Sequence, residues 1–241
     1  MKNYLLFIAL MASFQIFSQE AYMYSGNNLT QYKYKIGTEK LSSNLQSGSG
    51  NFYEVGLINP IIGKRIFYSL GFSINEYNAV GATLTSTYRW NTKFMGADSG
   101  FLISLFPHKS IKTNTVNKDK TAKDKSVNNQ SSTDKSDNKV YKALSLKRFD
   151  VLFNVGAKVA TIVYGKQEID GVFFDLKKEK EFAGVFIGSN VGVKLKYYIA
   201  PYASTSVGYN FCQSFNFSNR TEEKLSFNTN QVQFGLHLNI N

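Results

Sequence analysis

The sequence predicts an all-β fold: an eight-stranded antiparallel up-and-down transmembrane β-barrel behind a cleaved N-terminal signal peptide. The first observation is that the last ten residues alternate strictly between apolar and polar side chains. The apolar set is Val232, Phe234, Leu236, Leu238 and Ile240. A β-strand has a period of two, so this stretch has one apolar face, and its length suits a tilted strand that crosses a bilayer. The second observation is that the same alternation recurs along the chain. The third is that no run of about 18 apolar residues follows the signal, which leaves a barrel as the only membrane fold.

Residues 1–18 have the features of a secretory signal peptide. Lys2 supplies a short positive start, residues 4–10 supply an apolar core, and Ser18 is a small residue before the cut. Cleavage after Ser18 leaves residues 19–241 as one barrel domain. An exported chain does not routinely meet nucleic acid, so we assign the net charge of +11 to one loop and to contact with lipopolysaccharide phosphates.

Alternation and turn residues mark eight candidate strands. They cover residues 31–38, 51–59, 65–77, 92–106, 147–161, 183–197, 202–215 and 225–240. In the first strand, Tyr32, Tyr34 and Ile36 are expected to face outward, and Lys33 and Lys35 inward. In the eighth, the alternation changes phase near residues 229–231, which fits either a β-bulge or a point where the strand leaves the membrane.

The kind of residue on the polar face places that face inside the barrel. A soluble barrel such as a lipocalin also alternates, but its outer surface is normally rich in Lys, Glu and Asp. Here the polar face is mostly Gly, Ser and Asn, which suit the crowded interior of a narrow barrel, so the apolar face is assigned to lipid. Two aromatic sets near strand ends are expected to form the interfacial girdles. They are Tyr88, Trp90 and Phe94 at one end, and Tyr197, Tyr198 and Tyr202 at the other.

The connections between strands indicate the topology. Both ends of an even-stranded barrel lie in the periplasm, where turns are short, and residues 61–64 and 198–201 fit this rule. The outer loops are then residues 38–50, 78–91, 162–182 and 216–224. An insertion at about 108–140 breaks the rule, because it lies where a short periplasmic turn is expected. It is too poor in apolar residues to bury a core, so we predict that it is disordered. A tether to peptidoglycan or to an acidic partner is the alternative.

Three features carry a family resemblance: the signal ending Phe17-Ser18-Gln19, the eight-strand hairpin pattern and the closing sequence LSFNTNQVQFGLHLNIN. On these features the mature chain resembles the small outer-membrane β-barrel proteins of the OmpA/OmpX type, and among them the forms common in Bacteroidota-like bacteria. The resemblance implies an integral barrel and no particular activity. Many family members end on phenylalanine, whereas this chain ends on Asn241. The peptidoglycan-binding domain of longer relatives does not follow the barrel, so their anchoring role is not implied.

Charged residues on the predicted inner face form a candidate lumen charge network. Its members are Lys35, Glu54, Asp98, Asp150, Lys158, Lys194 and Lys196. Buried charges must be paired to be tolerated. Antiparallel neighbours suggest the pairs Glu54–Lys35, Asp98–Lys158 and Asp150–Lys196. We predict that these pairs fill and rigidify the lumen, and a narrow cation-lined path for small anions is the alternative.

Few residues are placed for catalysis or metal binding. His108 begins the insertion and His237 lies near the periplasmic end of the last strand, so neither suits chemistry at the outer surface. The acidic cluster of the third outer loop is expected to be solvated, with a weak cation site as the alternative. Its members are Glu168, Asp170 and Asp175. The single cysteine, Cys212, cannot form an internal disulfide and is expected to fill space. The sequence therefore predicts no enzyme, no cofactor and no metal site.

We expect a monomeric, non-enzymatic barrel in the outer membrane of a Gram-negative bacterium, with periplasmic termini. Its role is expected to be structural or interactive at the cell surface, through the outer loops. The expected partners are outer-membrane lipids and lipopolysaccharide, a cell-surface or periplasmic protein partner is left open, and nucleic acid is not expected. Two alternatives stay open: a porin-like narrow pore for small solutes or anions, and a soluble periplasmic lipid-binding barrel.

Overall fold

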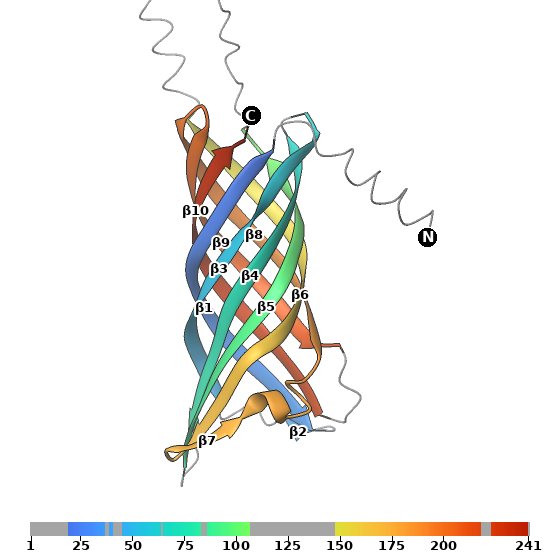
Figure 1. Ribbon diagram of the computed structural model, residues 1–241, viewed down its shortest axis with the longest axis vertical. Helices are drawn as coiled ribbons and strands as arrows, with labels where there is room; N and C mark the ends of the chain where they lie inside the picture. The colour runs from blue at the N-terminus through green and yellow to red at the C-terminus, as the bar shows by residue number, and fades with distance from the viewer. Residues whose placement is uncertain are drawn as a thin grey trace, which may run out of the picture.

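Eight long antiparallel strands close into a barrel in the computed structural model, which describes residues 19–36, 39–40, 45–63, 65–82, 86–106, 148–217 and 223–240 (Figure 1). The strands are β1 (Glu20–Ile36), β3 (Leu45–Ile62), β4 (Ile66–Ala82), β5 (Thr87–Ser104), β6 (Phe149–Ile169), β8 (Val185–Ala200), β9 (Ala203–Asn216) and β10 (Glu223–Asn239). Each strand pairs with the next, and β10 pairs with β1 to close the sheet. The predicted eight-stranded up-and-down barrel is confirmed. No helix in the described part of the chain is long and apolar enough to cross a membrane.

The two ends of the barrel differ. At the terminal end, β1 begins and β10 ends; at the loop end lie β2 (Glu39–Lys40), β7 (Val172–Asp175) and the 3-10 helix η2 (Leu176–Lys178) (Figure 1). The strands are 14 to 21 residues long and most of them extend farther toward the loop end than the alternation predicted. β1 instead begins at Glu20 rather than at Gln31. The predicted signal peptide, residues 1–18, and the predicted insertion at about 108–140 lie outside the described residues.

The strands are staggered around the barrel. A path that starts at Met23 and crosses each strand pair once returns to β1 at Lys33, ten residues farther along the strand. A stagger of this size tilts the strands and leaves an interior that side chains fill. The path also begins on an exposed methionine and ends on an exposed lysine, so the outer surface changes character along the barrel axis.

β10 shows that change most clearly. Near the terminal end, Leu236 faces outward and Gln233 and His237 face the lumen. Toward the loop end, Phe227 is buried in the lumen and Asn228 faces outward. The register with β1 and β9 runs without a shift through this region, so the bulge is wrong, and the strand leaving the membrane near residues 229–231 stays as the other prediction. The direction of the side chains never changes; the outer surface becomes polar and the lumen becomes apolar.

The same inversion overturns the prediction for β1. Tyr32 is buried in the lumen and Lys33 is exposed, the reverse of the expected assignment. Tyr34 is half-buried and packs against the buried aromatic residues. The physical reason is that the loop-end half of the lumen is filled by apolar side chains, so an aromatic residue there is stable inside and a lysine is stable outside.

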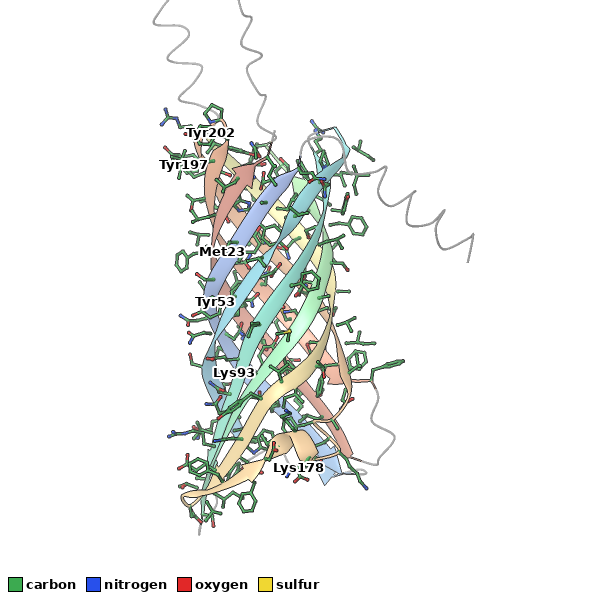
Figure 2. All side chains as sticks on the ribbon, in the orientation of Figure 1. Met23, Tyr53, Lys93, Lys178, Tyr197 and Tyr202 are labelled. Atoms are coloured by element: carbon green, nitrogen blue, oxygen red, sulfur yellow. The ribbon has the colours of Figure 1, made fainter. Side chains whose placement is uncertain are left out.

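One of the two predicted girdles is wrong. Trp90 and Phe94 are buried in the lumen, and Tyr88 packs against them rather than facing lipid. At the terminal end, Tyr197 and Tyr202 lie on the outer surface as predicted (Figure 2). Tyr198 is the exception at this end, since its ring faces inward. The Nζ of the buried Lys196 lies 5.1 Å from the centroid of this ring.

Two connections at the terminal end, β3 to β4 and β8 to β9, are short, as expected, and most of the third, from β5 to β6, lies outside the described residues. Gly63, with φ of 57°, turns the chain between β3 and β4, a backbone conformation that glycine adopts without strain. Pro201 and Tyr202 turn the chain between β8 and β9. The predicted outer loop at 162–182 is largely structured instead: β6 runs to Ile169, and the chain folds back through β7 and η2. This segment buries Leu176 and Phe182, so it closes over the barrel instead of remaining solvated.

Candidate functional site

The lumen is the site that the chain builds. Its two main layers are polar and aromatic, and a smaller cluster of buried apolar side chains, Phe52, Ile58, Leu102 and Leu152, packs with Tyr22 and Tyr24. The layer nearer the terminal end is polar and charged, and we call it the lumen network. Its members are Glu20, Tyr22, Tyr24, Glu54, Asp98, Lys158, Lys194, Lys196 and His237, with the small polar residues that bond to them. Alternation on β1, β3, β5, β6, β8 and β10 directs each of these side chains inward.

Glu20 joins the first strand to two others at the terminal end. Its carboxylate accepts hydrogen bonds from the Lys196 Nζ at 2.6 and 2.7 Å and lies 2.6 Å from the His237 Nδ1. The His237 Nε2 lies 2.9 Å from the Ser206 Oγ. Lys196 and His237 are buried. A buried carboxylate with partners of this kind holds its charge, and truncating either partner leaves a charge unpaired.

Two further carboxylates lie deeper in the lumen. Glu54 accepts a 2.6 Å hydrogen bond from the Tyr22 hydroxyl. Asp98 forms an ion pair with Lys158 at 3.1 Å and accepts a 2.5 Å hydrogen bond from the Ser73 hydroxyl. The structure therefore brings Asp98 and Lys158 together, as their predicted cross-strand pairing requires. It also joins them to β4, which the sequence had not suggested.

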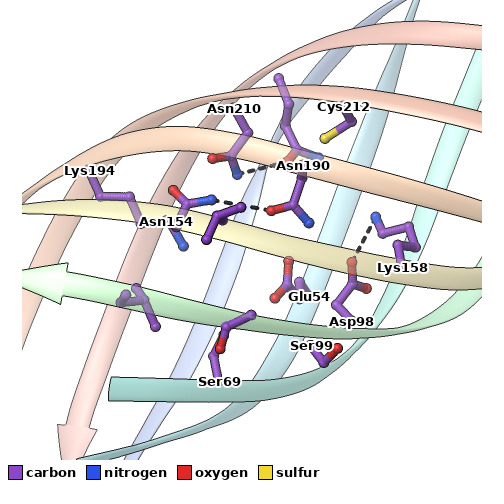
Figure 3. Close-up of a pocket in the computed structure, with 14 residues that line it drawn as sticks. Glu54, Ser69, Asp98, Ser99, Asn154, Lys158, Asn190, Lys194, Asn210 and Cys212 are labelled. Carbon is purple, nitrogen blue, oxygen red and sulfur yellow. Dashed lines mark hydrogen bonds and ion pairs between the residues drawn. The ribbon is translucent and has the colours of Figure 1, made fainter. Parts of the chain in front are cut away.

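Lys194 has a different neighbour from the other buried lysines. Its Nζ lies 4.0 Å from the centroid of the Tyr24 ring. In this cation–π contact, the face of the ring attracts the ammonium group. Beside it lies a small polar cavity of about 30 Å³, lined by Glu54, Asp98, Lys158 and Lys194 and by the amides of Asn154, Asn190, Asn210 and Gln231 (Figure 3). Cys212 also lines the cavity, which agrees with its expected role as a lumen-facing filler. The volume suits a few water molecules and no larger solute.

Two of the three predicted charge pairs do not form. Asp150 lies directly across from Lys196 in the β6–β8 register, but Asp150 accepts from the Ser104 hydroxyl at 2.6 Å and from the Phe106 amide at 3.0 Å. The long Lys196 side chain reaches across the lumen to Glu20 instead. Glu54 lies across from Tyr24 on β1, and Lys35 lies eleven residues farther along that strand, across from Lys224 and Lys40. The predicted Glu54–Lys35 pair is therefore wrong.

The sequence missed Glu20, Tyr22 and Tyr24 because it placed the start of the first strand too late. Residues 20–30 put large tyrosines inward and small residues such as Ala21 and Ser25 outward. Hydropathy then differs little between the two faces and gives no signal. The available signal was the unbroken alternation at the chain end, because a last strand that long needs an equally long first strand to close the barrel.

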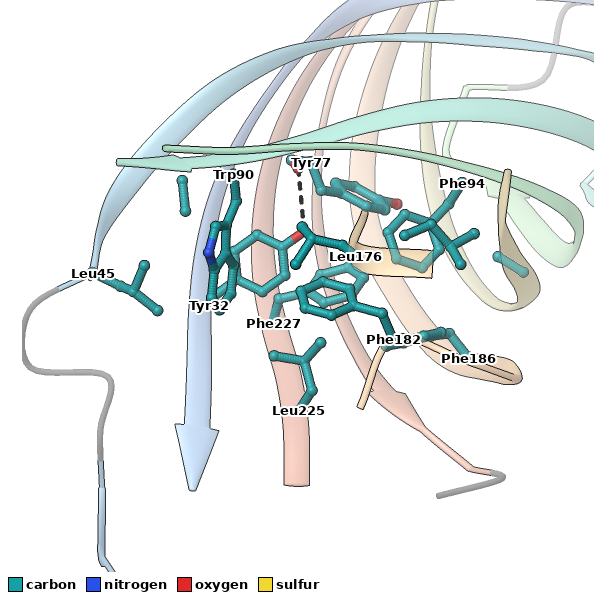
Figure 4. Packing of buried hydrophobic residues seen from close by; sticks show 13 residues of the cluster. Tyr32, Leu45, Tyr77, Trp90, Phe94, Leu176, Phe182, Phe186, Leu225 and Phe227 are labelled. Carbon is teal, nitrogen blue, oxygen red and sulfur yellow. Dashed lines mark hydrogen bonds between the residues drawn. The ribbon is translucent and has the colours of Figure 1, made fainter. Parts of the chain in front are cut away.

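The second layer of the lumen, nearer the loop end, is an aromatic plug. It consists of Tyr32, Leu45, Tyr77, Ala79, Trp90, Phe94, Ala160, Ile162, Leu176, Phe182, Phe186, Leu225 and Phe227, all buried (Figure 4). The rings pack at centroid distances of 4.6 Å between Tyr77 and Phe227 and 4.9 Å between Phe94 and Phe186. Tyr32 donates its hydroxyl to the Tyr77 carbonyl at 3.2 Å. The plug takes side chains from every barrel strand except β9, and these close-packed side chains fill the lumen between the loop end and the lumen network.

The acidic residues of the third loop do not converge. Asp170 accepts from the Thr87 amide at 2.9 Å, and this bond lowers the pKa of the Asp170 carboxyl below its usual range. Asp175 caps η2 by accepting from the Lys177 amide at 3.0 Å. Glu168 lies on β6 across from Phe173. Among the described residues, no three His, Cys, Asp or Glu side chains gather where they could hold a metal ion.

Comparisons with known proteins found matches among solved structures only. No protein-family model matches the chain, and no curated protein matches it in sequence. Solved structures similar to it include the outer membrane protein OprG from Pseudomonas aeruginosa, with 10% identity, a TM-score of 0.44, and coverage of 92% of this chain and 96% of that chain. The outer membrane protease OmpT from Escherichia coli has 8% identity and a TM-score of 0.45, covering 94% and 100%. Neisserial surface protein A has 10% identity and a TM-score of 0.41, covering 90% and 96%. All three TM-scores are below 0.5, and the closed barrel is defined by the strand pairing of this chain itself.

Proposed function

We propose that the chain is an integral protein of the bacterial outer membrane, a monomeric barrel with a closed lumen and a structural or surface-interaction role. One observation carries the proposal: in the terminal half, exposed apolar side chains encircle a polar lumen. Exposed side chains of this belt come from every strand and include Met23, Val55, Phe72, Phe101, Phe153, Val193, Val207 and Leu236. Water-soluble proteins rarely expose a contiguous apolar surface of this extent, whereas a bilayer requires one.

The soluble lipid-binding alternative fits this arrangement poorly. A soluble barrel that holds a lipid has an apolar cavity inside and a polar surface outside. The terminal half has the reverse: Met23 and Tyr53 point outward (Figure 2), and the interior beside them holds Tyr24, Glu54 and Lys194. The loop-end half does have an apolar interior, but the aromatic plug fills it.

The narrow-pore alternative needs a continuous path through the lumen. Two layers oppose it. The lumen network pairs Glu20 with Lys196 across the bore and Asp98 with Lys158 between the neighbouring strands β5 and β6, and the aromatic plug lies between that network and the loop end. The lysine surplus that favoured an anion path is largely neutralised by these carboxylates, so we propose a lumen that holds the barrel rigid and carries no solute.

A relay of three hydrogen-bonded polar side chains at the terminal end resembles the catalytic triad of a hydrolase only in the order of its groups. Ser206, His237 and Glu20 follow the order of nucleophile, base and orienting carboxylate. A nucleophile needs space for a substrate carbonyl, but Ser206 is 2% exposed and His237 is 1% exposed. The ring of Tyr24 and the Ser206 hydroxyl also lie so close to Gly235 that even a methyl group there would collide with both. We therefore propose a structural role for this relay and no enzymatic activity.

The proposed orientation places the terminal end in the periplasm and the loop end outside the cell. The short β3–β4 and β8–β9 turns at the terminal end support this orientation, because periplasmic turns of outer-membrane barrels are short; the β5–β6 connection, with the insertion, departs from the rule. The polar outer surface of the loop-end half then lies in water and among lipid headgroups. The partners proposed for it are lipopolysaccharide and, through the segment formed by β7 and η2, other molecules at the cell surface.

Membrane fractionation followed by planar-bilayer recording tests the proposal. We expect the protein in the outer-membrane fraction, faster migration of the unboiled barrel on a gel, and no steady single-channel current from the refolded protein. Recovery in the soluble periplasm would contradict the membrane assignment. A steady current through the wild-type barrel would leave that assignment intact and contradict the closed lumen.

A further inference from the structure

The apolar outer surface reaches farther toward the loop end on one side of the barrel than on the other. On β6, β8 and β9, the side chains of Val163, Val185, Phe215 and Phe217 face outward, and Phe215 and Phe217 are 48% and 69% exposed. We call these four residues the upper patch. They lie beyond the level at which the outer surface of β10 and β1 has become polar.

The stagger of the strands allows levels to be compared. A ten-residue stagger over eight strands means that each step across the sheet rises by roughly 1.25 residues. With this rise taken into account, Phe215 and Val185 lie at about the same level as Gln31 on β1, Lys93 on β5 and Asn228 on β10. At this level, one side of the barrel is apolar and the other is polar or charged.

The upper patch continues the apolar belt below it. On β6, Val155, Ala157 and Val159 lead without a charged residue to Val163. Thr161 lies between them, and its hydroxyl donates to the Gly184 carbonyl at 3.1 Å, so its polar group is already bonded within the protein. Ser189 on β8 and Gln213 on β9, which pair across the two strands, are the polar exceptions on this side.

The strands outside the patch have the character of a headgroup layer at this level. Lys93, on β5 next to β6, forms a partly exposed ion pair with Glu76 at 2.7 Å, and Lys33 is exposed on β1. Charged side chains at this level are favourable in water or among headgroups and costly in hydrocarbon.

We propose that the acyl chains of outer-leaflet lipid cover the upper patch, so that hydrocarbon rises roughly 10 Å farther along β6, β8 and β9 than along β10, β1 and β3. The inference rests on the proposed membrane location and adds an asymmetry to it. Continuity with the lipid-facing belt identifies the occupant, because the patch has no polar boundary from the belt along β6. A barrel of this kind leans in its bilayer or thickens the outer leaflet on one side.

Tryptophan quenching by lipids brominated in their acyl chains tests this asymmetry. Trp90 is the single native tryptophan and lies in the aromatic plug, so the wild-type protein supplies the background. Phe215→Trp and Phe217→Trp report on the upper patch, Gln31→Trp on β1 and Asn228→Trp on β10 report on the same level outside the patch, and Phe234→Trp reports on the belt. Vesicles of brominated and unmodified phosphatidylcholine are compared.

We expect Phe215→Trp and Phe217→Trp to be quenched to at least half the extent of Phe234→Trp, and Gln31→Trp and Asn228→Trp to stay near background. Quenching of Phe234→Trp alone would overturn the asymmetry, because it would mean that water or a second copy of the chain covers the upper patch. The membrane location would then still hold. Absence of quenching at Phe234→Trp would overturn the membrane location itself. Having two patch variants keeps the test decisive if one of them fails to refold.

Discussion

Replacing Lys196 with methionine is expected to destabilise the barrel by about 3–5 kcal/mol, because it leaves the buried Glu20 carboxylate without its cation. The Lys196 Nζ makes two hydrogen bonds to that carboxylate, and the lysine itself is buried. Equilibrium unfolding of the refolded barrel in urea measures the loss. Lys93→Met is the matched control, since Lys93 pairs with Glu76 on the exposed surface and an exposed pair contributes about 0–1 kcal/mol.

Double-mutant cycles then identify the partner of Lys196. Glu20→Gln combined with Lys196→Met should recover much of the loss, because the unpaired charge disappears. Asp150→Asn combined with Lys196→Met should be additive within about 0.5 kcal/mol, since Asp150 is bonded to Ser104 and to the Phe106 amide. Strong coupling to Asp150 and none to Glu20 would restore the pairing that the sequence suggested and contradict the contacts described here.

Replacing Phe94 with alanine is expected to cost about 3–5 kcal/mol, because it leaves a cavity at the centre of the aromatic plug. Phe94 is fully buried and packs against Tyr77, Phe186 and Phe227. Met95 is the next residue, points outward and is 49% exposed, so Met95→Ala is the matched control and should cost far less. Unfolding followed by Trp90 fluorescence checks both, since Trp90 lies in the same plug. Equal losses for the two variants would mean that the loop-end half of the lumen is not packed.

The terminal half of the barrel could be predicted from the sequence because two signals agree there. The side chains alternate, and the outward set is also the apolar set, as Leu236 and His237 show. In the loop-end half, the alternation persists but its chemistry is reversed. Tyr32 and Phe227 were therefore placed outside, or attributed to a bulge, although both lie in the lumen. Alternation gives the geometry of a strand, and only the surroundings of each face decide which side is apolar.

The lumen network could be predicted only where partners lie directly across a strand pair. Asp98 and Lys158 are cross-strand neighbours and meet. Asp150 and Lys196 are also cross-strand neighbours, yet each finds a better partner, because the lysine side chain spans the bore and the aspartate lies beside a backbone amide. Contacts across a closed barrel depend on strands far apart in sequence, and a pattern read strand by strand does not contain them.

The outer surface of strands such as β10 passes from lipid to water along the strand, and a pair of arginine substitutions on β10 tests this claim most directly. Leu236 and Asn228 both face outward on the same strand, on either side of the inversion. We expect Leu236→Arg to destabilise the barrel refolded in lipid vesicles by about 2–4 kcal/mol and Asn228→Arg by no more than about 1 kcal/mol. Equal costs at the two positions, or a larger cost at Asn228, would contradict the claim.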